Sequence, residues 1–125
     1  MSTRSTVKFY SEFEQEEPLL SVYQQCDGYI GGIGHSLAKW LKGKTLINGI
    51  GNQTMEKGFA NGMGCLAAQY VADNKTCIGS FYTTTNSNKQ EYNYEVRFIN
   101  GQLIIQVGSF KGTPEELLNY NEEEE

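Results

Sequence analysis

The sequence predicts a single α+β domain in which an antiparallel sheet of about five strands carries two main helices on one face. Three observations lead to this prediction. The 125 residues are enough for one domain with one core. Strand-like alternation occurs near both ends of the chain, with two helical patterns between them. Short hairpin signals favour antiparallel neighbours and place the helices together on one face.

The N-terminal third is predicted to form a hairpin followed by a helix. Residues 4–12 and 19–26 are rich in β-branched and aromatic side chains and read as two strands. A glycine-dense stretch then leads into a helix over 33–42, for which Gly43 is the stop signal.

The middle of the chain is predicted to contain a long loop and the second helix. Residues 44–50 are an apolar run of ambiguous structure, and residues 49–64 form a loop rich in Gly, Asn and Gln. Loops of this length in a small domain are often functional. Helical spacing over 63–74 indicates the second helix. Its buried stripe is expected to consist of Met63, Leu66, Ala67, Tyr70 and Val71.

The C-terminal third is predicted to be three strands and a short helix. The strands are expected over 77–84, 91–99 and 102–108. Asn100-Gly101 between the last two is a strong signal for a two-residue hairpin turn. Thr113-Pro114 begins the helix, because threonine is a good N-cap and proline suits the first helical position.

Charge is distributed unevenly along the chain. The net charge is −5, yet ten of the 15 acidic residues lie before Pro18 or after Thr113. Between these points are eight basic and five acidic residues, so the central body is positive. Acidic ends disfavour DNA or RNA as a partner, whereas a positive body suits a small phosphorylated ligand. We expect 1–125 to be one ligand-binding domain whose residues from about 120 to 125 are a disordered acidic tail.

Composition also excludes several classes of protein. No apolar run is long enough to span a bilayer, so no membrane partner is expected. Three widely spaced cysteines indicate a reduced, intracellular chain rather than a disulfide framework. With one histidine and no C-x-x-C pair, neither a metal site nor a cofactor is predicted.

A glycine motif and a lysine suggest a phosphate site. Gly62 and Gly64 belong to a G-x-G-x-x-A pattern at the start of the second predicted helix, where free backbone N–H groups favour a phosphate. The alternative is that these glycines only allow close packing of the helix on the sheet. Lys57 in the preceding loop could meet the phosphate or simply be solvated.

Aromatic side chains suggest a platform for a planar ring. Aromatic and hydroxyl residues alternate over 79–85 and 91–94, which we expect to be paired strands. Such a surface could stack a base while Asn93 bonds its polar edge, or it could be made of ordinary cross-strand pairs. Eight tyrosines and six phenylalanines exceed what a thin core hides, which favours a homo-oligomer.

No catalytic residue is predicted. Cys65 at a helix start could be a nucleophile, and His35 is then the sole histidine available as its base. No acidic residue has a recognisable orienting role. A hydrolase or phosphodiesterase that depends on His35 or Cys65 is therefore kept as an alternative.

Several motifs spread over nearly the whole chain occur together. They are Met1-Ser2-Thr3-Arg4-Ser5-Thr6, Asp27-Gly28-Tyr29 followed by Gly31, Gly34 and Leu37, Gly62-Met63-Gly64-Cys65-Leu66-Ala67-Ala68-Gln69, Gly79-x-Phe81-Tyr82, and Glu91-Tyr92-x-Tyr94. With these motifs the chain resembles the phage Thoeris anti-defence sponge proteins, the first family described.

The resemblance implies a non-enzymatic binder that acts in the host bacterial cytoplasm. Proteins of this family sequester glycocyclic ADP-ribose, the cyclic ADP-ribose-type signal of Thoeris defence, without cleaving it, so the effector stays inactive. They form symmetric homo-oligomers, for which the resemblance implies a dimer-based hexamer with ligand near the subunit contacts. Some also bind cyclic oligonucleotides at separate sites.

The resemblance also implies roles for particular residues. Phe81 and Asn93 would contact the base or ribose, with Tyr82 beside them and Tyr92 as the alternative to Asn93.

The remaining roles concern phosphates. Lys57 would meet the diphosphate near Gly62 and Gly64, and Lys111 would serve a separate phosphate site. A protein–protein inhibitor of a host defence component is the third function class that the sequence leaves open.

Overall fold

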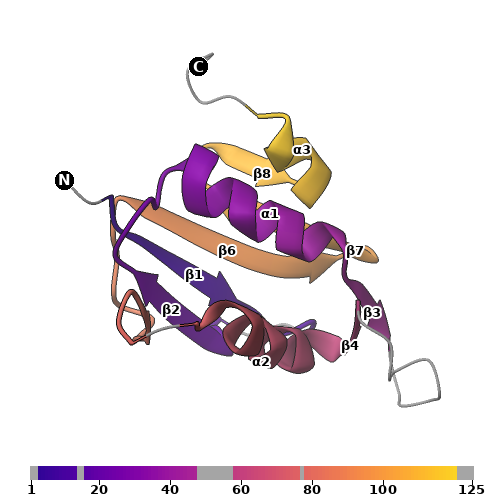
Figure 1. Cartoon of the computed structure of the whole chain (residues 1–125). Coiled ribbons are helices and arrows are strands. Elements are labelled where there is room, and N and C mark those ends of the chain that lie inside the picture. The colour runs from indigo at the N-terminus through magenta and orange to yellow at the C-terminus, as the bar shows by residue number, and fades with distance from the viewer. Residues whose placement is uncertain (1–2, 14–15, 48–57, 77, 121–125) are drawn as a thin grey trace.

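The structure, a computed structural model, describes residues 3–13, 16–47, 58–76 and 78–120. These residues form one small α+β domain (Figure 1). Its elements in chain order are β1 (Ser5–Phe9), β2 (Leu20–Gln24), the π-helical turn η1 (Ile30–Gly34), α1 (His35–Lys42), β3 (Thr45–Ile47), β4 (Phe59–Asn61), α2 (Gly62–Asn74), β5 (Phe81–Thr83), β6 (Tyr92–Ile99), β7 (Gln102–Val107), β8 (Phe110–Gly112) and α3 (Pro114–Leu118).

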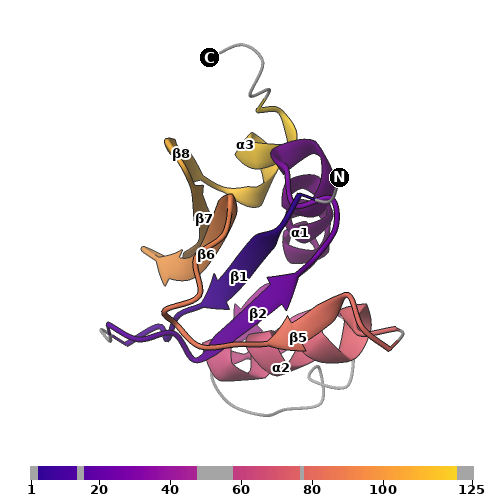
Figure 2. The same ribbon diagram turned by 90° about the vertical axis from the view of Figure 1, so that its left-hand side faces the viewer.

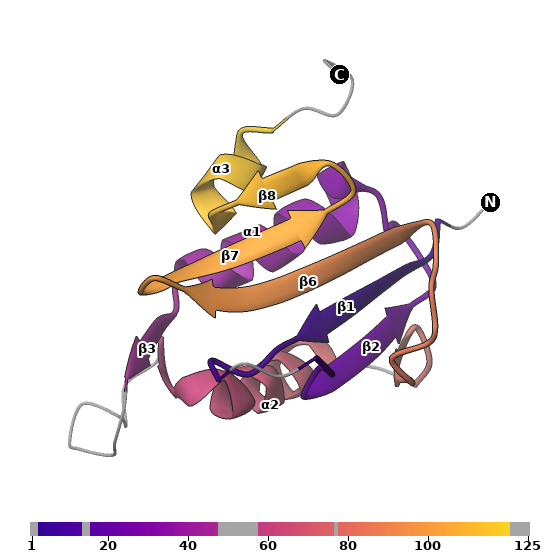
Figure 3. The same ribbon diagram turned by 180° about the vertical axis from the view of Figure 1, so that it is seen from behind.

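The domain has a sheet layer and a helix layer. Six strands form the main sheet in the order β5-β2-β1-β6-β7-β8. Helices α1 and α2 lie in front of this sheet in Figure 1, and in the view from behind the strands lie in front of the helices (Figure 3). The predicted α+β class, with two main helices on one face, is confirmed.

The prediction of a purely antiparallel sheet is wrong, because the sheet is mixed. β1 pairs with β2 in antiparallel fashion but with β6 in parallel, with Ser5 opposite Tyr92 and Phe9 opposite Val96. The expected pairing of 77–84 with 91–99 is also wrong, since β2 and β1 lie between β5 and β6. Alternation along a strand reports which face is buried, but it does not report which strand lies beside it.

Several short elements differ from the prediction. β5 covers three residues instead of 77–84, and β8 was not predicted. The ambiguous run 44–50 contains β3, which pairs in parallel with β4 at the end of the predicted long loop. Three-residue strands are too short to show a recognisable alternation. Residues 49–57 of that loop, residue 48 before it and the acidic tail 121–125 lie outside the described residues.

The strong local signals are confirmed. Both helices form close to their predicted bounds, although η1 precedes α1. Asn100 and Gly101 have φ values of 52° and 78°, the two positive values that a type I′ hairpin turn requires. Thr113 caps α3: its Oγ1 accepts from the Glu116 backbone N–H, and its own N–H donates to the Glu116 carboxylate. Within the described residues, no helix combines the length and apolar character needed to cross a membrane.

Tyr70 of α2 lies at the centre of the core. Its ring is 5.1 Å from that of Phe9, 5.2 Å from that of Trp40 and 5.7 Å from that of Phe81. Its hydroxyl accepts a hydrogen bond from the Gln24 side chain, with a nitrogen–oxygen distance of 3.0 Å. Burial raises the pKa of Tyr70 to about 12 from 10.0, although the Gln24 hydrogen bond opposes this shift.

We expect this burial to make stability fall at high pH. The folded-state pKa is above the unfolded one, so the stabilisation is complete below pH 10 and is lost as pH rises through about 12. Two pKa units correspond to about 2–3 kcal/mol of unfolding free energy. Urea unfolding from pH 8 to 11.5 should show a steeper loss for the wild-type protein than for Tyr70→Phe. Equal losses of unfolding free energy in the wild-type protein and in Tyr70→Phe would contradict the raised pKa of Tyr70.

Candidate ligand-binding site

The residues predicted from sequence to bind ligand do not lie close together in the folded domain. β5 is separated from β6 by three strand spacings, about 14 Å in a sheet with the usual spacing. β8 is at the edge of the sheet opposite to β5. The predicted residues are Phe81 and Tyr82 on β5, Tyr92 and Asn93 on β6, Lys111 on β8, and Gly62 and Gly64 in the first turn of α2, while Lys57 lies outside the described residues.

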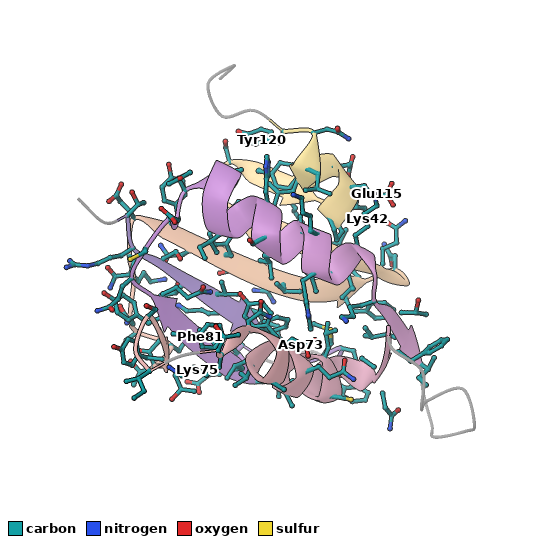
Figure 4. All side chains as sticks on the ribbon, viewed as in Figure 1. Lys42, Asp73, Lys75, Phe81, Glu115 and Tyr120 are labelled. Atoms are coloured by element: carbon teal, nitrogen blue, oxygen red, sulfur yellow. The ribbon has the colours of Figure 1, made fainter. Side chains whose placement is uncertain are left out.

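Phe81 and Tyr82 point to opposite faces of the sheet. Phe81 is only 8% exposed and packs on Tyr70 in the core, at the C-terminal end of α2 (Figure 4). Tyr82 is 44% exposed on the other face, with its ring centroid 6.1 Å from that of Tyr23. The Lys75 ammonium lies 5.5 Å from the Tyr82 ring centroid. Within a single chain, Tyr82 therefore offers an open aromatic surface and Phe81 does not.

A hollow of about 210 Å³ lies beside Tyr92. We call it the Tyr92 hollow, and it is lined by Ile30, Glu91, Tyr92, Asn93, Val107, Gly108, Ser109 and Tyr120. The Tyr92 ring is stacked on Tyr94 at a centroid distance of 6.4 Å, and the Tyr120 ring packs against Phe110 at 4.9 Å. Figure 4 shows Tyr120 beside the N-terminal end of α1. The hollow thus combines two supported aromatic rings with a hydroxyl and a carboxylate.

The size of the Tyr92 hollow limits what one chain can enclose. Pockets that hold drug-sized ligands are roughly 300–1,000 Å³. At about 210 Å³ this hollow has room for a part of a nucleotide, such as a base. Any larger ligand must extend beyond it.

Larger hollows lie around Phe98, at the end of β6. One of them, of about 530 Å³, is lined by Ser11, Glu12, Phe13, Glu16, Arg97, Phe98 and Ile99. It contains two carboxylates and one guanidinium, and that guanidinium is already engaged. Arg97 pairs with Glu95 at 3.1 Å and stacks 3.7 Å from the centroid of the Tyr10 ring. This hollow therefore suits a phosphorylated ligand less well than its volume alone would indicate.

A carboxylate of the protein itself lies at the start of α2, where a phosphate site was predicted. The two oxygens of Glu12 are 3.3 and 3.4 Å from the backbone nitrogen of Met63. Gly62 has a φ of 85°, and a Cβ there would lie 2.6 Å from Glu12 Oε2. A phosphate could reach the Met63 N–H only by displacing Glu12. The sequence did not indicate this contact, because Glu12 and Met63 are 51 residues apart.

We expect Glu12 to stabilise the domain as a cap of α2. Glu12→Ala removes a negative charge and an acceptor at the helix N-terminus, which should lower the unfolding free energy by about 0.5–1 kcal/mol. Urea unfolding at low and high salt measures this loss, which added salt should reduce. Glu16→Ala, in the same loop, is the matched control. Equal losses in both variants would show that Glu12 does not act as a cap.

The candidate nucleophile and base belong to different helices. His35 begins α1, and its buried Nε2 has no hydrogen-bond partner in the described part of the chain. Cys65 is half-buried in the first turn of α2. Across residues 3–13, 16–47, 58–76 and 78–120, no three His, Cys, Asp or Glu side chains gather where they could hold a metal ion.

Comparison with known proteins adds no relative: no protein-family model, curated protein or solved structure matches the chain.

Proposed function

We propose that this protein binds and sequesters a cyclic ADP-ribose-type signal, glycocyclic ADP-ribose, without cleaving it. In this role it would block activation of a Thoeris effector in the cytoplasm of a host bacterium. The observation that supports the proposal best is the Tyr92 hollow, which combines aromatic rings and polar groups in a space the size of a base. The motif resemblance supplies the identity of the ligand.

The groups of the Tyr92 hollow match the chemistry of an adenine. The rings of Tyr92 and Tyr120 offer apolar faces against which a base can pack, and stacking of this kind is worth about 1–3 kcal/mol per base. The Glu91 carboxylate can accept hydrogen bonds from an exocyclic amine, and the Ser109 hydroxyl can donate to a ring nitrogen. The ribose and diphosphate would lie outside the hollow.

Tight sequestration requires that the rest of the ligand be enclosed as well. Nanomolar binding corresponds to about −12 kcal/mol, which a small ligand reaches only when most of its surface is buried. We propose that a second copy of the chain completes the site, in a dimer-based oligomer that the resemblance extends to a hexamer. The exposed Lys111, two residues beyond Ser109 on an edge strand, is suited to meet a phosphate of this ligand or of a cyclic oligonucleotide.

A capture-and-release experiment tests the proposal. The protein is incubated with glycocyclic ADP-ribose, unbound ligand is removed by filtration, and the supernatant of the heat-denatured protein is chromatographed. We expect ligand to be depleted and then recovered intact. A new product would indicate the alternative hydrolase or phosphodiesterase. No depletion at micromolar protein would reject this ligand and favour an inhibitor of a host protein.

Substitution of Tyr92 tests the position of the site. Tyr92→Ala should weaken binding about 5- to 150-fold, because it removes one stacking surface worth about 1–3 kcal/mol. Phe13→Ala, which removes an aromatic ring that is 72% exposed outside the Tyr92 hollow, is the control and should bind as the wild type does. Titration calorimetry measures both. Equal affinities for Tyr92→Ala and the wild type would place the ligand elsewhere.

A further inference from the structure

Residues 84–91 form a crossover connection that joins β5 to β6. The connection leads from the β5 edge past β2 and β1 to the start of β6 (Figure 2). It covers side chains of β1 that alternate with the core residues Val7 and Phe9 and so point away from α1 and α2. Thr6 is fully buried and Lys8 is 2% exposed on that face.

Two side chains hold the crossover connection to the sheet. The Lys8 ammonium donates to the Asn86 carbonyl oxygen at 2.8 Å. Asn93 Oδ1 accepts from the Thr6 hydroxyl at 2.7 Å and from the Gln90 N–H at 3.0 Å, and Asn93 Nδ2 donates to the Gln90 carbonyl at 2.7 Å. Asn93 thus uses three of the four hydrogen bonds that an amide side chain can make.

The Asn93 hydrogen bonds close a short loop around two residues of the Tyr92 hollow. Glu91 and Tyr92 are the residues between Gln90 and Asn93, and both line the hollow. Because Gln90 is tied to Asn93 on both its N–H and its carbonyl, the backbone of Glu91 and Tyr92 has little freedom. The Glu91 carboxylate and the Tyr92 ring therefore start from a backbone whose position beside the hollow is fixed.

We propose that Asn93, held in place by Thr6, is a positioning residue that presents Glu91 and Tyr92 to the ligand rather than a residue that binds the ligand itself. This role rests on the proposed function. It assigns Asn93 a different task from the base or ribose contact that the resemblance implies. It also gives Thr6, which no ligand can reach, a part in binding.

A double-mutant cycle on ligand affinity tests this role. Thr6→Val is close to isosteric, removes the hydroxyl that donates to Asn93, and changes nothing at the surface. Calorimetric titration with glycocyclic ADP-ribose should show an affinity lower by about 3- to 10-fold for Thr6→Val, the range of one net hydrogen bond, and a larger loss for Asn93→Ala. The double variant should bind no worse than Asn93→Ala, because both substitutions release the same loop.

The matched control is Ser21→Ala, which removes a buried hydroxyl on the same face of the neighbouring strand, opposite Lys8. It should leave the affinity unchanged even if it lowers stability, so a general effect of destabilisation is distinguished from positioning. Unchanged affinity for Thr6→Val, with a loss for Asn93→Ala alone, would overturn the positioning role and make Asn93 a direct contact. Absence of binding by the wild-type protein would overturn the proposed function and this role together.

Discussion

The parallel pairing of β1 with β6 is the constraint on which the rest of the structure depends. It puts the N-terminal strand in the interior of the sheet, so β5 must be connected to β6 across two strands. The crossover connection that results buries Thr6 and Lys8 on the face away from the helices. Burial lowers the pKa of Lys8, assisted by the nearby Lys89 and opposed by Glu95. The same connection ends at Glu91, on the rim of the Tyr92 hollow.

The glycine-dense stretch before α1 is explained by close packing against the same strands. The Tyr94 hydroxyl of β6 donates to the Gly28 carbonyl at 2.7 Å, and a Cβ at Gly34 would lie 3.0 Å from that hydroxyl oxygen. A Cβ at Gly28 would lie 2.8 Å from that of Ser5. These glycines let η1 lie directly on β1 and β6, which places Ile30 in the wall of the Tyr92 hollow. Their role here is steric, since a Cβ at either position would come too close to an atom that is already there.

The candidate site is divided between a base-sized hollow and open surfaces elsewhere. Aromatic rings and a carboxylate surround the hollow, whereas the cations Lys75 and Lys111 lie toward opposite edges of the sheet. A ligand with both a base and a diphosphate needs these two kinds of group close together. Assembly of several copies would satisfy this need, because an edge strand of one copy can lie beside the hollow of another. The homo-oligomer therefore remains a prediction, and its expected role is to bring the hollow of one copy close to the cations of another.

The sequence by itself determined the elements that depend on near neighbours. Residues close together in the sequence determine three of these elements: the Asn100-Gly101 turn, the Thr113 cap and the extent of α2. The aromatic and amide context also indicated Tyr92 and Asn93 as candidate ligand contacts, which stay predictions, although it did not indicate the residues that surround them.

Only the tertiary structure decided which strand lies beside β1, that Phe81 is in the core, and that Asn93 and the start of α2 already have partners. The Thr6–Asn93 contact joins residues 87 apart, and the Glu12–Met63 contact joins residues 51 apart. Such contacts form because the folded backbone brings complementary polar groups within hydrogen-bond distance. Local periodicity carries no information about that distance, since it reports the face on which a side chain lies and not the residue that it meets.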